Sequence, residues 1–396
     1  MNILVLNAGS SSLKYQLISM PSQQVKCVGL VERIGMDDAI FTHEKGKQEH
    51  NEVCPIPDHT VALKKVEAAL MHADYGVVKN VDEIDAVGHR VVHGGSRFTK
   101  TVMVTEDVKE NIKELFALAP LHNPANLTGI EVAESVFKNA KQAVIFDTAF
   151  HQTMPQEAYQ YAIPNKYLSE DEIRAYGFHG TSHKYVSEKA IEYLGEKSKN
   201  IITIHLGNGC SISAIKDGKC VEHSMGLGPS NGLVMGTRAG DIDQSVIFHL
   251  QKKFGKTAEE VNHILQKESG MKGLTGHSDL RDIGNLAAEG NKDCINALNL
   301  AAHRIKKYIG SYTAILNGLD AIVFTAGIGE NSSLMRELSC KDMDWLGIQL
   351  DNEINNTRAK GIREIQKADG KVKVLIIPTN EEIEIAKQTF DLLQES

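Results

Sequence analysis

The sequence is poor in cysteine and in tryptophan. Its six cysteines are Cys27, Cys54, Cys210, Cys220, Cys294 and Cys340, and no two of them have the C-x-x-C spacing of a zinc or redox site. Their number and spacing exclude a disulfide framework, so we expect reduced thiols in the core or at the surface. The single tryptophan, Trp345, lies far from every motif described below. We expect its side chain to contribute to packing.

Basic residues are not in excess, and no long apolar run is present. The 396 residues include 43 Lys and Arg against 51 Asp and Glu, a formal net charge of -8. This balance points to no nucleic-acid or anionic-membrane partner, so cations that meet a phosphate must be concentrated locally. No apolar run approaches transmembrane length, and the chain enters a strand pattern directly, without a signal-like segment. We therefore expect a cytoplasmic protein with no membrane and no nucleic-acid partner.

The N-terminal stretch predicts a hairpin that can grip a phosphate. Two short apolar runs flank the polar turn N-A-G-S-S-S, which begins at Asn7. Gly9 lets the backbone approach an anion, Ser10 and Ser12 offer hydroxyl donors, and Lys14 returns a positive charge to the same end. An ordinary serine-rich hairpin is an equally good interpretation, because the spacing is not that of a Walker motif.

The same pattern returns in the second half of the chain. The apolar run from Ile201 to His205 is followed by the turn L-G-N-G-C-S and a second apolar run that ends at Ile215. Length and 42% hydrophobic composition allow more than one core, so the repeat predicts a duplicated fold. Two such turns that face each other across a cleft would hold a polyphosphate. Coincidence between two hairpins is the alternative.

Two charged residues follow or interrupt buried strands. Arg90 lies between Val87 and Val91, where a charged group needs a partner or a ligand, although a surface salt bridge is the simpler alternative. Asp147 follows the apolar run 143–146, which predicts a buried parallel strand. Ligands bind at the carboxyl edge of such strands, so Asp147 is a candidate site residue, with helix capping as the competing role.

Glycines single out two further residues. His179 has a glycine on each side within two positions, which exposes its ring, and Thr181 or Ser182 is predicted to cap the helix that follows. The stretch 224–243 is rich in glycine yet holds large apolar residues, unlike a flexible linker. We expect an active-site loop that presents Arg238.

A helix, a strand and a third glycine turn follow near the C-terminus. The apolar spacing predicts a helix over 295–316, stopped by Gly318, and a buried strand over 321–324. The turn T-A-G-I-G-E-N then suits a nucleoside, and Asn331 is predicted to cap the next helix.

Eight motifs occur in order along the chain. They are N-A-G-S-S-S-L-K from Asn7, H-R-V-V-H-G-G from His89, F-D-T-A-F-H from Phe146, G-F-H-G-T-S-H from Gly177, H-L-G-N-G from His205, M-G-T-R-A-G-D-I-D from Met235, G-I-G-E-N from Gly327 and P-T-N-E-E from Pro378. Together they resemble the acetate kinase family over essentially the full length. The resemblance implies an α/β protein with the duplicated actin-like, ribonuclease H-like ATPase fold, two lobes with a central cleft, and usually a homodimer. The expected lobes are 1–149 with 383–396, and 150–382.

The resemblance implies reversible in-line transfer of the ATP γ-phosphate to acetate, giving acetyl phosphate and ADP, or to propionate or another short carboxylate as the alternative. It assigns Arg90 and Arg238 to the acetate carboxylate, and Arg238 with His179 to the charge that spreads over the phosphoryl oxygens. The family assigns Asp147 as an acid or base. Acetate is already deprotonated at neutral pH, so we expect Asp147 to orient magnesium or Arg90 instead.

The same resemblance implies sites for the metal and for ATP. Asn7 and Glu381, with Glu382 as the adjacent candidate, are expected at Mg²⁺ or Mn²⁺. The residues expected at the ATP phosphates are Lys14, Ser10, Ser12, His205, Leu206, Gly207, Asn208 and Gly209. Those expected on the adenosine side are Asp279, Leu280, Arg281, Gly327, Ile328, Gly329, Glu330 and Asn331.

The positions that match the family's pocket for the acetate methyl group are Val92, Leu121, Phe178 and Pro229. Such a pocket discriminates weakly, because one methylene is worth only about 1 to 3 kcal/mol. The chain also reads G-P-S-N-G from Gly228 where the family commonly has T-P-L-E-G. Propionate is therefore expected as a poorer substrate that the enzyme still accepts, and a preference for butyrate would contradict the assignment.

Two other protein classes share some of these features. A non-catalytic actin-like filament or chaperone ATPase would have the glycine turns, but it has no use for two arginines and a histidine at a second small anion. A sugar kinase would need a carbohydrate-binding set of Asp, Asn and Trp residues, and this chain has one tryptophan. Trapping of an acyl phosphate by hydroxylamine separates these classes.

Overall fold

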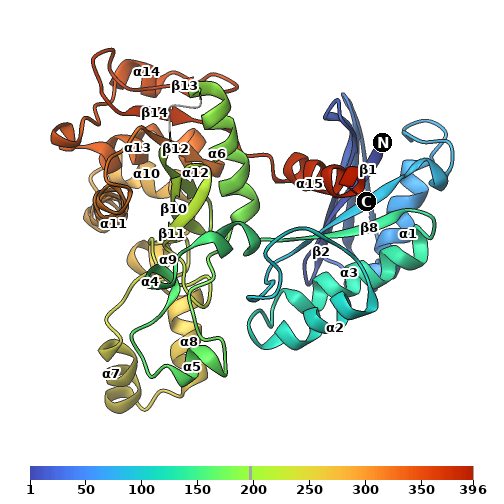
Figure 1. Cartoon of the computed structure of the whole chain (residues 1–396), viewed down its shortest axis with the longest axis horizontal. Coiled ribbons are helices and arrows are strands. Elements are labelled where there is room, and N and C mark those ends of the chain that lie inside the picture. Colours follow the sequence, from blue (N-terminus) through green and yellow to red (C-terminus); the bar gives the residue numbers. More distant parts are fainter. Residues whose placement is uncertain (196–198, 396) are drawn as a thin grey trace. The chain divides into compact units, whose positions relative to one another are not determined.

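The computed structural model describes residues 1–195 and 199–395, which form two compact units (Figure 1). Unit 1 comprises Met1–Phe150 with Asn380–Ser396, and unit 2 comprises His151–Thr379. The sequence placed the two boundaries at 149/150 and 382/383. The second boundary lies earlier because the cap of the last helix belongs with that helix: Oδ1 of Asn380 accepts a hydrogen bond from the Ile383 amide at 2.9 Å.

Unit 1 is built on a sheet with the strand order β5-β4-β3-β2-β1-β6-β8-β7. Its strands are β1 (Asn2–Ala8), β2 (Ser12–Ser19), β3 (Gln24–Glu32), β4 (Ala39–Lys45), β5 (Gln48–Cys54), β6 (Ala86–Val91), β7 (Val102–Met103) and β8 (Lys141–Phe146). The predicted N-terminal hairpin is β1 with β2, which pair antiparallel. On its other side β1 pairs parallel with β6, and β6 pairs parallel with β8.

Helices cover both faces of the central strands of unit 1. They are α1 (His59–Leu70), α2 (Glu106–Glu114), α3 (Asn123–Val136) and α15 (Glu381–Glu395). Alternate residues of β1 point to opposite faces: Ile3 belongs to the core under α15 with Ile385, and Leu4 to the core under α1 with Leu63. A strand buried on both faces is apolar at successive positions, which explains the run that follows Asn2. Figure 1 shows α15 in red beside the blue strands.

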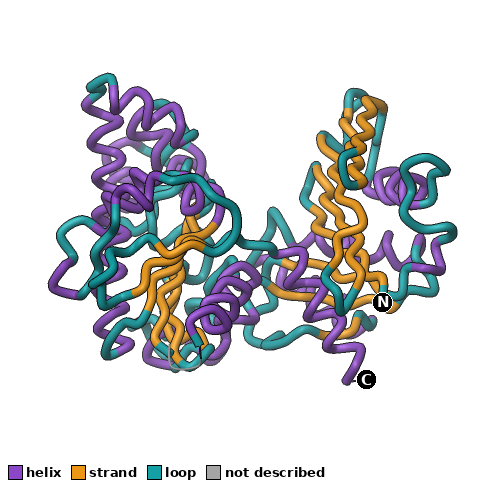
Figure 2. The backbone as a smooth tube through the Cα atoms, turned by 90° about the horizontal axis from the view of Figure 1, so that it is seen from above, coloured by secondary structure: helices purple, strands orange, loops and turns teal. Residues whose placement is uncertain are grey.

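Unit 2 is built on a sheet with the order β11-β10-β9-β12-β14-β13. Its strands are β9 (Asn200–Leu206), β10 (Cys210–Lys216), β11 (Lys219–His223), β12 (Ala321–Thr325), β13 (Arg363–Glu364) and β14 (Lys373–Ile376). Its helices are α4 (Gln156–Tyr159), α5 (Lys166–Ser169), α6 (Gly180–Leu194), α7 (Ser245–Phe254), α8 (Ala258–Lys267), α9 (Gly270–Thr275), α10 (Leu280–Ala288), α11 (Lys292–Leu316), α12 (Ala326–Asn331), α13 (Ser333–Cys340) and α14 (Asn352–Asn356). Figure 2 shows the strands of each unit in orange and the helices in purple. Helix α6 contacts β9 and β12, and α11 contacts β9 and β10.

The two sheets repeat one topology. In unit 1 the strands β3-β2-β1-β6-β8 run antiparallel, antiparallel, parallel and parallel to their successive neighbours. In unit 2 the strands β11-β10-β9-β12-β14 follow the same order with the same directions. Each sheet adds a short antiparallel strand beyond the last parallel one, β7 or β13. Five strands that agree in order and direction confirm the duplication predicted from the hairpins.

The predicted cap of α6 was wrong. Thr181 and Ser182 lie inside the first turn of α6, and the residue before the helix is His179, with φ of 56°. This left-handed conformation is uncommon for a residue with a side chain. His179 is therefore the residue directly before the first turn of α6. The sequence had predicted a loop residue at this position, followed by a hydroxyl cap at Thr181 or Ser182.

Helix boundaries near the nucleotide motifs were also partly wrong. The glycine turn after β12 is the short helix α12, which ends at Asn331, and Ser332 caps α13 by accepting from the Met335 amide at 3.3 Å. The long helix α11 is capped by Asn317 in the left-handed conformation, one residue before the predicted glycine. Asparagine is one of the few residues other than glycine that adopt this conformation readily.

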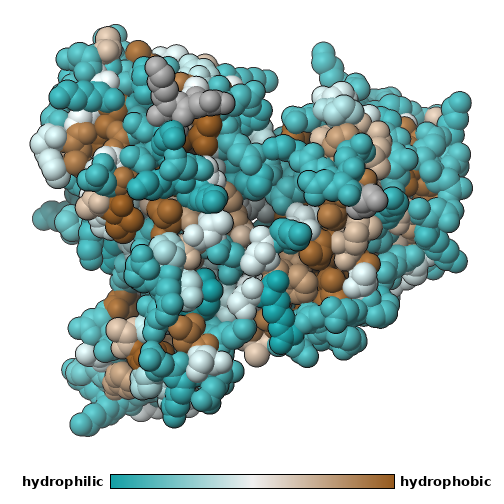
Figure 3. Space-filling model, in the orientation of Figure 1, coloured by the Kyte–Doolittle hydropathy of each residue, from teal (hydrophilic) through white to brown (hydrophobic). Residues whose placement is uncertain are grey.

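On the face shown in Figure 3, apolar side chains lie in groups among hydrophilic ones. Trp345 is 81% exposed, so the expectation that it packs was wrong. It lies in a 3-10 helix of one turn, Asp344–Leu346, which is too short to bury every side chain. All six cysteines are free thiols, and five of them are buried. None of the helices in the described residues is long and apolar enough to cross a membrane.

Candidate active site

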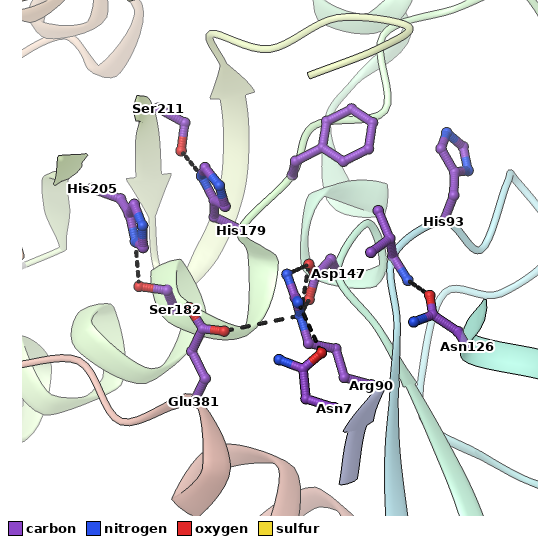
Figure 4. A network of polar contacts seen from close by, with 12 residues as sticks. Asn7, Arg90, His93, Asn126, Asp147, His179, Ser182, His205, Ser211 and Glu381 are labelled. Carbon is purple, nitrogen blue, oxygen red and sulfur yellow. Dashed lines mark hydrogen bonds and ion pairs between the residues drawn. The ribbon is translucent and has the colours of Figure 1, made fainter. Parts of the chain in front are cut away.

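Unit 1 gathers four of the predicted site residues around one guanidinium group (Figure 4). Asn7, Arg90 and Asp147 lie at or just after the carboxyl ends of β1, β6 and β8, which are parallel neighbours. The carboxyl ends of parallel strands meet at one edge of a sheet, so residues far apart in sequence come together there. Glu381, the first residue of α15, completes the group. We call these four residues the Arg90 set.

Arg90 is held by three neighbours. Its Nε lies 3.0 Å from both carboxylate oxygens of Asp147, its Nη2 also donates to that carboxylate, and its Nη1 lies 3.2 Å from Oδ1 of Asn7. Glu381 is farther away, with Oε2 at 3.9 Å from Nε. A guanidinium has five N–H groups. Within the described part of the chain the hydrogen bonds use three of them, and two N–H groups remain for a ligand.

The charges in the Arg90 set influence each other. Burial lowers the pKa of Arg90, but the charges of Asp147 and Glu381 more than offset this and raise it above its ordinary value. Burial raises the pKa of Glu381, the charges of Asp147 and Glu382 raise it further, and Arg90 opposes them. Arg90 is therefore a permanent cation among carboxylates.

Lys14 and Glu382 form an ion pair beside this set. The predicted hairpin thus does return a positive charge to the end of β1, where Glu382 neutralises it. The pair also separates the two candidate carboxylates: Glu382 contacts Lys14, and Glu381 faces Arg90. Ser10, on the turn of the same hairpin, is exposed, and Ser12 is half-buried.

The side-chain oxygens of the Arg90 set fit a magnesium ion whose remaining ligands are waters and substrate phosphates. Asn7, Asp147 and Glu381 offer amide and carboxylate oxygens, which are the ligands of hard cations. The described residues contain no group of three or more His, Cys, Asp or Glu side chains that could hold a metal. Mg²⁺ commonly keeps several waters and binds through one or two carboxylates plus substrate phosphates.

Two asparagines that the sequence analysis missed fix the backbone of this edge. Oδ1 of Asn126 accepts from the Val92 amide at 3.1 Å, and its Nδ2 donates to the Ala8 carbonyl at 2.6 Å. Asn123 bonds the amide and the carbonyl of His93 in the same way, at 3.1 and 2.9 Å. Both side chains are buried at the start of α3. Two asparagines three residues apart on the sheet-facing side of a helix were the available signal.

The four residues expected at an acetate methyl group are divided between the units. Val92, buried, follows the Arg90 strand in unit 1, and Leu121 is 62% exposed on the turn before α3. In unit 2, Phe178 is buried next to His179, and the Pro229 carbonyl accepts from Nη1 of Arg238 at 2.9 Å.

His179 and Arg238 meet at the glycine turn between β9 and β10 in unit 2. A methyl group placed on Gly209 would lie 3.2 Å from Nε2 of His179 and 3.6 Å from Nη1 of Arg238. Both nitrogens therefore border the space directly over Gly209, which a side chain at this position would fill. Burial lowers the pKa of Arg238, yet an arginine stays charged at neutral pH. We call Gly209, His179 and Arg238 the His179 set.

A pocket of about 830 Å³ in unit 2 adjoins the same turn. Its volume is within the range of sites for small molecules and cofactors. The predicted ATP residues that line it are Gly207, Asn208, Asp279, Leu280, Arg281, Gly327, Ile328 and Asn331. Arg358 also lines it and was not predicted, because it lies outside every recognised motif. Residues from each of the unit 2 loops that the sequence assigned to the nucleotide thus line one pocket.

The other predicted nucleotide residues of unit 2 lie near this pocket without lining it. His205 stacks on His179, with ring centroids 4.3 Å apart, and Leu206 borders a small apolar cavity that shares residues with the pocket. The carbonyls of Gly329 and Glu330, both in α12, accept from Nη1 of the buried Arg336 at 2.8 and 3.0 Å. Arg336 was not predicted either, and it anchors the helix that follows β12.

Glu222, on β11, is a further titratable group in unit 2. Burial raises its pKa to about 7, although the His223 amide donates to its Oε1 at 3.1 Å. A carboxyl whose pKa is raised in the folded state contributes stability that is complete below pH 4.5 and is lost as the pH rises through 7. Near neutral pH the group is therefore only partly ionised.

Glu222→Gln should stabilise the protein at alkaline pH, because glutamine resembles the protonated carboxyl and can still accept from the amide. We expect a higher Tm than that of the wild type at pH 8, and a difference that shrinks as the pH falls toward 5. Thermal unfolding followed by circular dichroism at both pH values measures this. An equal shift at both pH values would show that the effect is not one of ionisation.

The geometry of both sets can be compared with known proteins. The model of the acetokinase family matches residues 2–387. The chain belongs to the acetokinase family. It is 61% identical to the acetate kinase of Flavobacterium johnsoniae, over 100% of both chains. Among solved structures, the acetate kinase of Porphyromonas gingivalis is 42% identical with a TM-score of 0.95, and a propionate kinase of Francisella tularensis is 40% identical with a TM-score of 0.93; each comparison covers 99% of both chains.

The acetokinase relatives also identify the fold. A TM-score of 0.95 over 99% of the chain confirms the α/β, duplicated actin-like fold that the sequence predicted, in agreement with the repeated sheets. Members of the acetokinase family are phosphotransferases with a carboxyl group as acceptor and use ATP as co-substrate.

Proposed function

We propose that this acetokinase catalyses the reversible transfer of the ATP γ-phosphate to acetate, giving acetyl phosphate and ADP. The observation that supports this most directly is the His179 set. Nε2 of His179 and Nη1 of Arg238 border one space over Gly209, beside a pocket lined by the predicted nucleotide loops. Nη1 of Arg238 also donates to the Pro229 carbonyl, and the other N–H groups of this guanidinium are the ones we assign to a ligand. A guanidinium and an imidazole that border one space next to a nucleotide suit a transferring phosphoryl group.

In the proposed reaction one carboxylate oxygen of acetate attacks the γ-phosphorus while the bond from phosphorus to the β,γ-bridging oxygen breaks. The bridging oxygen leaves with the bonding electron pair as part of ADP. Both reactants are anions, and two unit charges about 4 Å apart repel by roughly 4 kcal/mol at an intermediate dielectric constant. The two remaining N–H groups of Arg90 are suited to bind the acetate carboxylate and offset this repulsion.

We assign His179 and Arg238 to the phosphoryl oxygens. Charge spreads over these oxygens in the loose transition state, so fixed donors bind the transition state more tightly than the ground state. Removal of one such donor typically lowers kcat by about 10² to 10³.

We assign Asp147 to the positioning of Arg90 rather than to proton transfer. Both of its carboxylate oxygens receive hydrogen bonds from the guanidinium. A carboxylate nucleophile needs no general base, so the reaction leaves Asp147 available for this structural role.

A divalent metal, Mg²⁺ or Mn²⁺, is part of the proposal, with Asn7 and Glu381 as its protein ligands, directly or through water. When bound, such an ion neutralises charge on the nucleotide phosphates.

We also propose a cytoplasmic homodimer, as the resemblance implies. Exposed apolar residues of unit 2, such as Phe248 at 65% exposure on α7, are consistent with a covered face in a dimer.

Propionate is the second candidate acceptor. The loop from Gly228 to Gly232 departs from the common family sequence, and a propionate kinase shares 40% identity and the fold. The test is trapping of the acyl phosphate with hydroxylamine in the presence of Mg·ATP and acetate, propionate or butyrate. We expect kcat/KM to fall in that order, by about 10- to 200-fold per methylene. A preference for propionate would make that acid the substrate, and ATP hydrolysis without any hydroxamate would contradict the whole proposal.

A further inference from the structure

His179 is connected to a buried chain of side chains behind it. Its Nδ1, the ring nitrogen that does not face Gly209, lies 2.9 Å from Oγ of Ser211 on β10 (Figure 4). The same Oγ lies 2.7 Å from Nε2 of His183, and Nδ1 of His183 lies 2.7 Å from Oγ1 of Thr203. Ser211, His183 and Thr203 are all fully buried. We call these three residues the relay.

The number of protons in the relay is limited. A serine hydroxyl donates one hydrogen bond, so Ser211 can donate to His179 or to His183 but not to both. Burial keeps the pKa of His183 well below its usual range, so this ring is neutral and carries one N–H. When the Ser211 hydroxyl donates within the relay, two arrangements are therefore consistent, and they run in opposite directions.

Each arrangement fixes the state of His179. When Nδ1 of His179 carries a proton, it donates to Ser211, Ser211 donates to His183, and His183 donates to Thr203. When that nitrogen is unprotonated, all three bonds reverse: Thr203 donates to His183, His183 to Ser211, and Ser211 to His179. In both arrangements each of these three hydrogen bonds is made, so the relay holds the ring in place whichever state His179 adopts.

We propose that Ser211, backed by His183 and Thr203, is a positioning residue that aims Nε2 of His179 at the transferred phosphoryl group and stabilises the proton on Nδ1. This inference rests on the proposed function. It deepens that function by assigning a role to residues that no motif singled out for catalysis. Orientation of a histidine through its second ring nitrogen is a general device, and loss of the partner group commonly lowers activity about 10- to 100-fold.

The neighbouring titratable groups are engaged elsewhere. The His205 ring stacks on His179, and its Nδ1 lies 2.8 Å from Oγ of Ser182. Arg238 is the charged neighbour at Gly209. His223, 5.2 Å from His183 between ring centroids, accepts the Phe178 amide at Nε2 and contacts Ser213 through Nδ1. Burial keeps the pKa of His223 well below its usual range as well, so it adds no charge at neutral pH.

Ser211→Ala tests the proposal, with Ser213→Ala as the matched control. Ser213 lies two residues along β10, is equally buried, and contacts His223 instead of His179. We expect Ser211→Ala to lower kcat by about 10-fold, with the KM values for ATP and acetate nearly unchanged. The limb of the kcat–pH profile that reports His179 should move to lower pH, because the protonated ring loses its acceptor. Ser213→Ala should leave that limb in place and kcat close to the wild-type value.

Ser211→Cys provides a second variant that fills the same space with a poor hydrogen-bonding group, should the alanine variant unfold. Equal kcat and an unmoved pH limb in a folded Ser211 variant would overturn the relay, as would an identical change in Ser213→Ala. These outcomes are distinct from failure of the proposed function, in which the wild-type protein itself forms no hydroxamate.

Discussion

Arg90→Ala is expected to lower kcat/KM for acetate by about 10²- to 10³-fold while the KM for ATP changes little. The variant loses the two N–H groups assigned to the acetate carboxylate. It also leaves the buried Asp147 carboxylate, 2% exposed, without the cation to which it is paired. Removal of one partner from a buried ion pair is destabilising because an uncompensated charge remains. Steady-state kinetics with each substrate varied in turn measures the effect, and the hydroxamate assay confirms the product.

Two conservative variants separate the roles of the guanidinium and of its partner. Arg90→Lys keeps the charge but replaces the planar fork of five N–H groups with three on one nitrogen. This group does not reproduce the paired bonds to Asp147 together with paired bonds to a carboxylate ligand, so we expect most of the activity to be lost. Asp147→Asn keeps the shape and removes the charge, and we expect a smaller fall than for Arg90→Ala. Near wild-type activity in Arg90→Lys would show that a point charge suffices. A loss in Asp147→Asn as large as that in Arg90→Ala would argue for a direct role of the carboxylate.

The chemistry-bearing residues were predictable where a local pattern marked them. Arg90 stood out because a charge inside an apolar run needs a partner, and the structure supplies Asp147, 57 positions away. The topology could be anticipated in the same way, because the strand-turn-strand pattern at Asn7 recurs at His205 and the sheets repeat. The residues of each such signal lie close together in the chain, so one sequence suffices to read them.

Residues whose role depends on contacts between distant parts of the chain showed no local sequence pattern that would identify them. Asn126 joins the backbone at Val92 and at Ala8, and it is separated from Ala8 by 118 positions. In the sequence, Ser211 is only one serine of the second glycine-serine turn. Its role depends on the fold, because β10 brings its Oγ to 2.9 Å from Nδ1 of His179. Local propensity also failed at the start of α6, where His179 adopts a left-handed conformation and the expected hydroxyl caps lie inside the helix.

Gly209→Ala should lower kcat by about 10-fold, because it forces the His179 ring to shift by a few tenths of an ångström and a displacement of about 1 Å at reacting groups costs about 10²-fold. The added methyl group would lie 3.2 Å from Nε2 and 3.3 Å from Cε1 of His179, closer than ordinary packing allows, so the ring must move. The phosphoryl space that His179 shares with Arg238 would shrink at the same time. Steady-state kinetics and the Tm of the variant measure the two consequences separately, and we expect little change in Tm.

Gly310→Ala is the control for this prediction. Gly310 lies within α11 in the same unit, and a methyl group there meets open space. Alanine is favoured over glycine inside a helix by about 1 kcal/mol, so this variant should keep full turnover and gain stability. Full turnover in Gly209→Ala as well would mean that His179 does not act at the space over the turn. A raised KM for ATP with unchanged kcat would assign Gly209 to nucleotide binding alone, and the converging nitrogens of His179 and Arg238 would then need another explanation.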